Sequence, residues 1–451
     1  MRGSQSDKLL DNVLAQTVPM HGRMIHGRSS NGSLTEESQA YDVHGNFLRA
    51  VDRADLNERL LDELEGLSNV KLVFHSKLTG ADFRKRKAWF EQKSKRPQTA
   101  DGAPAEQVQP ASTDAKEIEV DFDLILGCDG AHSSVRHHMM KTVRMNYEQS
   151  YIDTIWCEFT ISPATGSSST SESAKDGFAT SPDHLHIWPS SHNMFIAIPS
   201  IDRSFTCTLF APAEEFAALE RDPWQVRAFF DENFPGAADL VGIAELQLQF
   251  EQNPHLPLIS IKCSPHHCSS SGVILGDAAH AMVPFYGQGM NAGLEDVRVL
   301  FEHLDRHATS SEGRAAALAD YSEERVPDAH TINDLASANY WEMHAGVRSP
   351  LTLFRKTVEE FLSDKLPSTG FSTQYARVSF STQRYSEVAQ IVARQGQILL
   401  GGLLATVVVP AALWTAWWIR RYSQASKTSV KAAESVFSFS LLYERLGRIF
   451  T

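Results

Sequence analysis

The sequence predicts an α/β protein with one α/β domain, a second domain built on a mixed β-sheet, C-terminal helices and one transmembrane helix. Three observations support this class. At 451 residues the chain is too long for one small core, so two domains are expected. Two short apolar runs each end in a glycine-containing turn followed by a helix, which is typical of strands in α/β folds. A strand-rich stretch lies between those turns, and helical periodicity follows the second.

Composition excludes several classes of partner and site. The net charge of −13 argues against nucleic acid as a general partner. Five cysteines form no disulfide-dense pattern, which fits a reducing compartment, and Met1–Leu14 lacks the apolar run of a secretory signal. The run Cys263–Cys268 contains ligand-type residues, but its spacing is too tight for a standard zinc loop. A turn between two strands is therefore expected there, and no metal site.

The stretch Gly272–Gly293 is the most informative motif of the chain. Val273–Leu275 is predicted as a buried strand that stops at Gly276-Asp277, and a glycine-rich loop then leads into a helix near Met290. An acidic side chain at the end of a strand can bind a sugar hydroxyl, and N–H groups of a glycine-rich turn at a helix N-terminus can bind an anion. A flavin, with a polyol chain and an electron-accepting ring, suits this arrangement. His280 follows the turn, where a structural role is expected rather than acid–base catalysis.

A second motif, Asp123–Arg136, supports the first. It reads as a strand followed by the turn Asp129-Gly130, where glycine lets the backbone pass close to a ligand. Ser133 is expected to cap the helix that carries Arg136. Either motif alone is a weak signal, since Asp-Gly turns are common. Both together, in this order, strongly predict a flavin site.

Composition and periodicity divide the chain into segments. Apolar runs predict strands in the middle of the chain, at Ile152–Ile161, Leu185–Trp188, Met194–Pro199 and Phe205–Phe210. The predicted segments are a partial ligand-binding domain at 1–150 with an exposed insert near 84–116, a sheet-based domain at 151–262, the return of the first domain at 263–335, a helical region at 336–392, a transmembrane helix at 396–419 and a basic tail at 420–451.

The C-terminal apolar segment is predicted to cross a membrane. The uncharged run between Arg394 and Arg420 is about 25 residues long, and a span needs about 20. Three tryptophans near its end suit a membrane interface, and a basic flank follows. The alternative is a buried core helix.

The two motifs, in this order, resemble the single-component FAD-dependent aromatic hydroxylases. The resemblance implies a Rossmann-like FAD domain, a sheet-based substrate domain and no separate NADPH domain. Four further runs are similar to the branch of this family that acts on L-kynurenine, as is the C-terminal anchor: Pro19–His26, Leu185–Pro189, Ser204–Phe210 and Val283–Gly293. This implies hydroxylation of L-kynurenine with NADPH and O2 in tryptophan degradation and NAD biosynthesis. It also implies the mitochondrial outer membrane, with the catalytic domain in the cytosol.

The resemblance also implies roles for particular residues. Arg23 and Tyr41 match positions that bind the substrate carboxylate, for which arginine is well suited. The other substrate residues implied are Asn339, Tyr375, Phe285, Tyr286, Glu342 and Met343. The FAD-binding residues implied are Arg53, Leu78, Asp129, Asp277, Gly287, Gln288, Gly289, Met290 and Asn291. No protein nucleophile is required, since the flavin performs the chemistry.

The beginning of the chain departs from this family. The first strand, the Gly-x-Gly-x-x-Gly loop that binds the FAD pyrophosphate and the following acidic residue are missing from the sequence. Two explanations stay open: a fragment or wrongly assigned start of a complete enzyme, or a genuinely short chain that binds FAD weakly or not at all. A different FAD-dependent aromatic hydroxylase is a further alternative, although Arg23 and Tyr41 argue against it.

Overall fold

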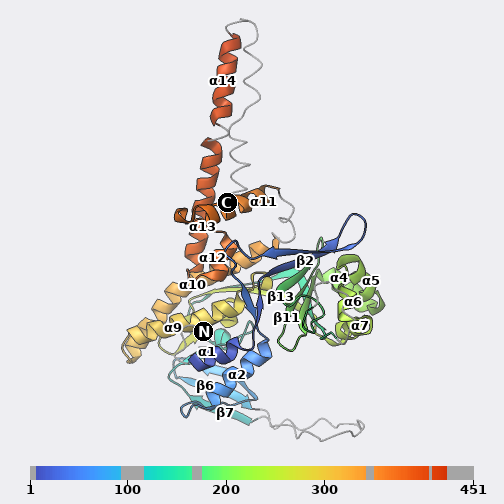
Figure 1. The fold of residues 1–451 in the computed structure, drawn as a ribbon. Coiled ribbons are helices and arrows are strands. Elements are labelled where there is room, and N and C mark those ends of the chain that lie inside the picture. Colours follow the sequence, from blue (N-terminus) through green and yellow to red (C-terminus); the bar gives the residue numbers. More distant parts are fainter. Residues whose placement is uncertain (1–6, 93–115, 165–174, 342–349, 406–408, 424–451) are drawn as a thin grey trace. The chain divides into compact units, whose positions relative to one another are not determined.

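The computed structural model describes residues 7–92, 116–164, 175–341, 350–405 and 409–423. It divides into two compact units (Figure 1). The large unit contains Met1–Tyr41 and Gly45–His344, and the small unit contains Asp42–His44 and Ala345–Thr451. Helix α10 runs from Ser311 to Trp341, across the boundary predicted at 335/336.

A seven-stranded mixed sheet forms the centre of the large unit. Its order is β13-β9-β12-β11-β10-β2-β3, and all neighbours are antiparallel except β10 and β2. The predicted mixed sheet and its four strands are therefore confirmed. The strands are β2 (Gly22–Arg28), β3 (Leu34–Ala40), β9 (Asn146–Ile161), β10 (His184–Pro189), β11 (Met194–Pro199), β12 (Phe205–Ala211) and β13 (Leu256–Ser264).

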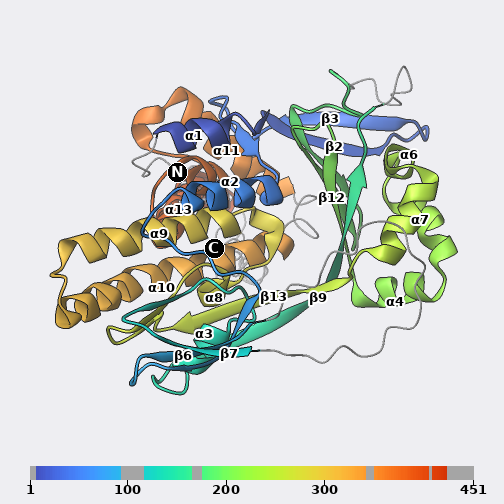
Figure 2. The same cartoon turned by 90° about the horizontal axis from the view of Figure 1, so that it is seen from below.

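Four helices, which the sequence did not predict within the sheet-based domain at 151–262, cover one face of this sheet. They are α4 (Ala213–Arg221), α5 (Val226–Asn233), α6 (Ala237–Val241) and α7 (Ile243–Gln252), and Figure 2 shows them grouped beside β9 and β12. Their apolar residues recur three or four positions apart, as in Phe216 and Leu219 or Leu246 and Phe250, so each helix buries one face. These side chains pack with Phe159 and Phe195 of the sheet in one core.

A smaller three-stranded sheet positions the two motifs. β8 (Ile125–Gly127) and β15 (Gly272–Ile274) are parallel neighbours, and β14 (His267–Cys268) pairs antiparallel with β15. The cysteine-containing run before β15 is thus the predicted turn between strands. Because β8 and β15 are parallel, both motif turns leave the sheet at the same edge. Helices α9 (Gly289–Arg306) and α10 pack on β15 through a buried cluster that includes Leu275, Leu300 and Tyr321.

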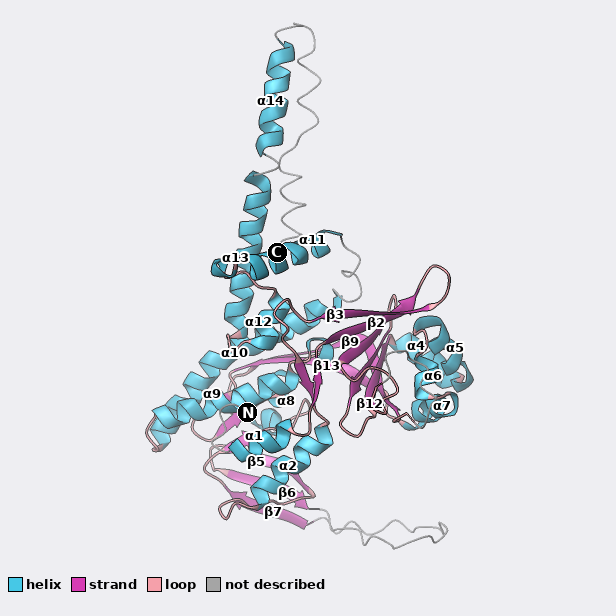
Figure 3. Ribbon diagram, in the orientation of Figure 1, coloured by secondary structure: helices cyan, strands magenta, loops and turns pink. Residues whose placement is uncertain are grey.

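The third sheet corrects the position of the insert. β5 (Ser76–Asp82), β6 (Lys87–Gln92) and β7 (Lys116–Asp121) form an antiparallel meander (Figure 3). The insert expected near 84–116 therefore contains a strand at its start, formed by Ala88, Trp89 and Phe90 within an otherwise charged run. Residues 93–115 lie outside the described part. The remaining elements of the large unit are α1 (Asp7–Leu14), β1 (Val18–Met20), β4 (Leu48–Ala50), α2 (Arg53–Glu65), α3 (Ser134–Met139) and α8 (Asp277–His280).

Close packing at Gly127 leads to a stability prediction. A Cβ at this position would lie 2.7 Å from Val135 Cγ1 and 2.9 Å from Ile274 Cγ2, in a buried cluster. Gly127→Ala is expected to lower the free energy of unfolding by about 1–3 kcal/mol, because the core must shift to admit a methyl group. Urea unfolding monitored by circular dichroism would measure this. Gly401→Ala is the control, because an added Cβ there meets no neighbour within 4 Å; an equal loss in both variants would contradict the packing argument.

The small unit contains helices α11 (Pro350–Lys365), α12 (Gln374–Phe380), α13 (Tyr385–Leu403) and α14 (Val409–Ser423). The helical region predicted at 336–392 is thus largely helical. Within the segment predicted as one helix at 396–419, the structure describes α13 up to Leu403 and α14 from Val409, and residues 406–408 lie outside the described part. Among the described residues, no helix is both long enough and apolar enough to cross a membrane. The tail beyond residue 423 lies outside the described part.

Candidate functional site

The turn Gly276-Asp277 follows β15 and opens α8. Gly276 has φ +55° and ψ −140°, a conformation that side-chain-bearing residues rarely adopt. Its carbonyl oxygen accepts hydrogen bonds from the N–H groups of Ala279 and His280 at 2.8 and 2.9 Å. The Asp277 side chain is exposed, whereas residues 278–280 are buried. The turn therefore presents one carboxylate outward on a fixed backbone.

Glycines of the two motifs leave their backbone open. Gly130 (φ +79°) and Gly287 (φ +68°) adopt left-handed conformations, and a Cβ added at either, or at Gly289, would meet nothing within 4 Å. Met290 and Asn291 are exposed at the start of α9, where backbone N–H groups are available to an anion. Gln288 is buried, so it differs from its exposed neighbours. A cradle of bare backbone beside an outward carboxylate fits a flavin.

The second motif is tied to the first by Arg136. Ser133 caps α3 as predicted, with its Oγ accepting from the Arg136 N–H at 2.9 Å, and Asp129 accepts from the Val135 N–H at 3.0 Å. The buried Arg136 guanidinium donates to Ala131 O and to Ala278 O, each at 2.6 Å. It thus joins the loop after β8 to α8. The sequence identified Arg136 only as part of a capped helix, and gave no signal for this bridge.

A buried carboxylate holds the same turn from behind. Asp296 on α9 accepts from the Gly276 N–H at 2.8 Å and from His280 Nε2 at 2.6 Å through one oxygen, and from Arg325 Nε at 2.8 Å through the other. Burial alone would raise the pKa of Asp296, but His280, Arg325 and the Gly276 N–H hold it well below its usual range. His280 is 1% exposed, and the Asp296 carboxylate engages its Nε2, which supports the expected structural role.

Arg23 and Tyr41 are brought together by the β2–β3 hairpin. Arg23 pairs with Gln39 in the ladder, and Tyr41 directly follows the end of β3 at Ala40. The Arg23 guanidinium carbon lies 5.6 Å from the centre of the Tyr41 ring, within reach of a cation–π contact. The ring is buried and the guanidinium is half-buried, so the pair presents a preorganised cation.

A second group of aromatic residues surrounds Phe285. The ring centre of Phe285 lies 5.0 Å from that of Phe210 on β12 and 4.7 Å from that of Tyr340 on α10. Asn339 Nδ2 donates to the Phe285 carbonyl oxygen at 2.7 Å, which fixes the loop carrying Phe285 and the buried Tyr286. Asn339 is thus a loop anchor here, and its contact with substrate stays a prediction.

Sequence reasoning missed three neighbours of this group: Phe210, Tyr340 and Thr154. The Tyr340 hydroxyl hydrogen-bonds Thr154 Oγ1 on β9 at 2.8 Å and so joins α10 to the sheet. The run Ser204–Phe210 and the residue following Asn339 were available as signals, but the pairing with Phe285 arises only from the fold.

The remaining residues predicted to bind substrate or cofactor lie outside the groups described above. Arg53 is exposed at the start of α2, with its guanidinium 3.5 Å from a Glu158 carboxylate oxygen, and Leu78 packs against the buried cluster around Phe83. Tyr375 belongs to α12 of the small unit. Glu342 and Met343 lie outside the described residues. The roles predicted for these five residues stay predictions.

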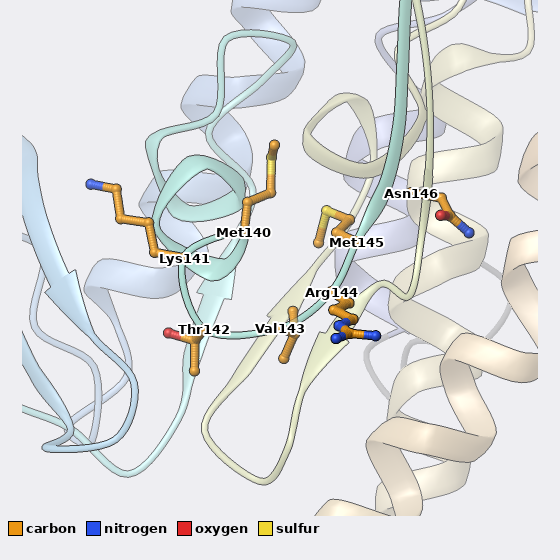
Figure 4. A pocket seen from close by; sticks show the side chains of 7 residues that line it. All are labelled: Met140, Lys141, Thr142, Val143, Arg144, Met145 and Asn146. Carbon is orange, nitrogen blue, oxygen red and sulfur yellow. The ribbon is translucent and has the colours of Figure 1, made fainter.

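One depression of the surface lies apart from the residues of this site. It measures about 410 Å³ and is lined by the loop after α3, from Met140 to Asn146 (Figure 4). None of its lining residues was predicted to bind substrate or cofactor. The loop follows α3 in the sequence, whereas Asp129 precedes α3. We assign it no role.

The described residues include no candidate metal site, and burial suppresses the ionisation of two cysteines. No group of three His, Cys, Asp or Glu side chains there could bind a metal ion. Burial raises the pKa of Cys157 and of Cys263 to about 12, so both thiols stay protonated at neutral pH.

Comparison with known proteins identifies the class of this site. Residues 72–336 match the family model described as an FAD binding domain. HpxO of Klebsiella pneumoniae, solved with FAD and uric acid, superposes with a TM-score of 0.52 at 18% identity over 80% of this chain and 81% of that chain. PqsL of Pseudomonas aeruginosa, a probable FAD-dependent monooxygenase, gives 0.53 at 19% identity over 74% and 82%. These likenesses establish the fold of the FAD-dependent aromatic hydroxylases.

Relatives at higher identity define the family. The kynurenine 3-monooxygenase of Chaetomium globosum is 57% identical over 414 residues, which cover 89% of this chain and 84% of the relative. That of Neurospora crassa is 54% identical over 424 residues, covering 91% and 80%. The chain therefore belongs to the kynurenine 3-monooxygenase family.

Proposed function

We propose that this protein hydroxylates L-kynurenine to 3-hydroxykynurenine, using FAD as cofactor and NADPH and O2 as co-substrates. The identity of more than half of the residues to kynurenine 3-monooxygenases carries this proposal. The preorganised Arg23–Tyr41 pair supports it, because the substrate is an amino acid whose carboxylate requires a fixed cation.

Different residues of the chain bind the cofactor and the substrate. The turn at Gly276-Asp277 and the start of α9 bind the flavin half of FAD, with Asp277 accepting hydrogen bonds from the ribityl hydroxyls. Phe285 and Tyr286 form an apolar wall for the aromatic ring of the substrate, and Arg23 holds its carboxylate. Bound FAD would supply the redox chemistry: NADPH would provide two electrons for the reduction of O2, one oxygen atom would enter the ring and the other would leave as water. The protein orients the reactants and excludes water.

The direct test expresses this chain and measures three properties. A purified, folded protein should show the visible absorbance of bound flavin, oxidise NADPH faster when L-kynurenine is added, and yield 3-hydroxykynurenine by mass spectrometry. Anthranilate, which shares the aminophenyl ring but lacks the amino-acid group, should not stimulate NADPH oxidation. A folded but colourless protein would contradict the proposal for this chain.

We also propose that the C-terminal segment attaches the protein to the mitochondrial outer membrane, with the catalytic unit in the cytosol. The uncharged run ending at Arg420 supports this, together with large apolar side chains that α14 leaves exposed, namely Leu413, Trp414, Trp417, Trp418 and Ile419. Exposed tryptophans beside a basic flank suit a membrane interface.

Deletion of residues 395–451 is expected to move the protein from the membrane fraction of cells to the soluble fraction. The deletion removes both the apolar segment and the basic flank that follows it, so neither part of the proposed anchor remains. Carbonate extraction followed by immunoblotting measures the distribution. Deletion of residues 424–451 alone is the control and should leave the protein with the membrane. A full-length chain found in the soluble fraction would argue against membrane attachment.

A further inference from the structure

The Asp296 carboxylate joins three separate elements at one buried point. It accepts hydrogen bonds from the backbone of Gly276 at the end of β15, from the ring of His280 on α8 and from Arg325 on α10. The side chains of Asp296, His280 and Arg325 are 0%, 1% and 2% exposed. A carboxylate is an acceptor only, so each of these contacts requires a donor from the partner.

The contacts of Asp296 fix the backbone that carries Asp277. The Gly276 N–H is bound by Asp296, and its carbonyl oxygen is bound by α8, so both polar groups of this residue are satisfied. Helix α9 approaches closely at the same place, because a Cβ on Gly293 would lie 3.5 Å from Gly276 Cα. Asp296 follows Gly293 by three residues, so it lies on the same face of α9, toward the turn.

Arg325 neutralises the charge of the buried Asp296 carboxylate and links this carboxylate to α10. Its guanidinium also donates to Ala292 O at 3.3 Å and lies 3.4 Å from Asp328. A buried charge that loses its partner is strongly destabilising, so this group of charges is maintained as a unit. The helix that supplies Arg325 also supplies Asn339, which anchors the loop of Phe285.

We propose that Asp296 is a positioning residue for FAD, which acts through Gly276 and His280 to orient Asp277 toward the cofactor. The inference rests on the flavin site, and not on which aromatic substrate is hydroxylated. In this arrangement His280 transfers no proton in the reaction, but serves as the donor that holds α8 against the Asp296 carboxylate.

The test uses a pair of substitutions at His280. His280→Leu removes the donor to Asp296, whereas His280→Gln keeps an N–H donor near the position of Nε2. The apoprotein of each variant is titrated with FAD by flavin fluorescence, and circular dichroism of the bound flavin reports its orientation. The Leu variant should bind FAD roughly tenfold or more weakly, with an altered flavin spectrum. The Gln variant should stay within about threefold of the unmodified protein.

Two further variants complete the experiment. Asp296→Asn should weaken FAD binding at least as much as His280→Leu, whereas Asp305→Asn, an exposed substitution on the same helix, should leave it unchanged.

Urea unfolding of each apoprotein separates an effect on the position of Asp277 from an effect on general stability. Lost stability with unchanged FAD affinity would overturn the proposal, as would equal effects of His280→Leu and His280→Gln. If Asp296→Asn fails to fold, the His280 pair decides. Kynurenine turnover by the unmodified protein tests the proposed function separately.

Discussion

Arg23→Ala is expected to weaken L-kynurenine binding roughly 30- to 150-fold, because a charge-assisted contact worth about 2–3 kcal/mol is lost. The side chain extends from β2, the neighbour of the edge strand β3, and lies against the buried ring of Tyr41. Binding is measured by titrating the flavin absorbance with kynurenine, and KM is obtained from NADPH oxidation.

Two controls sharpen this result. Arg23→Lys keeps the charge but loses the bidentate geometry of the guanidinium. Its affinity for L-kynurenine should therefore lie between that of the unmodified protein and that of Arg23→Ala. Arg28→Ala removes an exposed arginine from the end of the same strand and should change affinity less than twofold. An affinity for Arg23→Ala within about threefold of the unmodified protein would disprove the carboxylate assignment.

Acidification is expected to destabilise the large unit through a buried histidine pair. His26 Nε2 donates to His186 Nδ1 at 2.8 Å, since His186 Nε2 donates to the Ser181 carbonyl oxygen at 2.7 Å. His26 also stacks on Trp188 with ring centres 3.9 Å apart. Burial, with the neighbouring histidines, lowers the pKa of His26 from 6.5 to about 3, and burial lowers that of His186 to about 4.

The sign of the effect follows from these pKa values. Between pH 6.5 and about 4 the unfolded chain binds protons that the folded protein excludes, so stability is complete above pH 6.5 and falls as the pH decreases. One such histidine costs about 2 kcal/mol at pH 5. Urea unfolding at a series of pH values measures this loss.

His26→Gln isolates the contribution of the pair. The glutamine amide keeps an N–H donor for His186 but does not titrate, so the dependence of stability on pH between 6.5 and 4 should decrease by about one proton. His192→Gln, an exposed substitution, should leave that dependence unchanged. A stability that is constant from pH 7 to 4.5, or an unchanged slope in His26→Gln, would refute the explanation.

Particular residues show how far sequence reasoning reached. The turn Gly276-Asp277, the Ser133 cap and the strands β10–β12 were predicted because each depends on a few consecutive residues. The helices at 213–252 were missed because short amphipathic helices between strands resemble short apolar strands. Strand β6 was missed because charged neighbours concealed three apolar residues.

Some residues of the candidate site were likewise identified from the sequence, and others were found only in the structure. Gly130 and Gly276 were identified from the sequence because each follows an apolar strand in a turn, and positive φ values favour glycine, whereas Gly287 and Gly289 were implied by the resemblance. Asp296 and Arg325 carried no local signal, since an acidic residue on a helix is ordinarily exposed and only burial against β15 and α10 makes it an anchor. Tyr340 and Phe210 likewise meet Phe285 from distant parts of the chain.

The sequence by itself identified the two glycine-containing turns and, through the resemblance that they carry, the family and the arginine proposed for the substrate carboxylate, because backbone conformations and motif spacing are encoded locally. Only the tertiary structure decided how these parts are held. The parallel pairing of β8 with β15 sets both turns at one edge, and the β2–β3 hairpin places Arg23 over Tyr41. The buried charges of Asp296 and Arg325 can exist only where distant elements supply their partners.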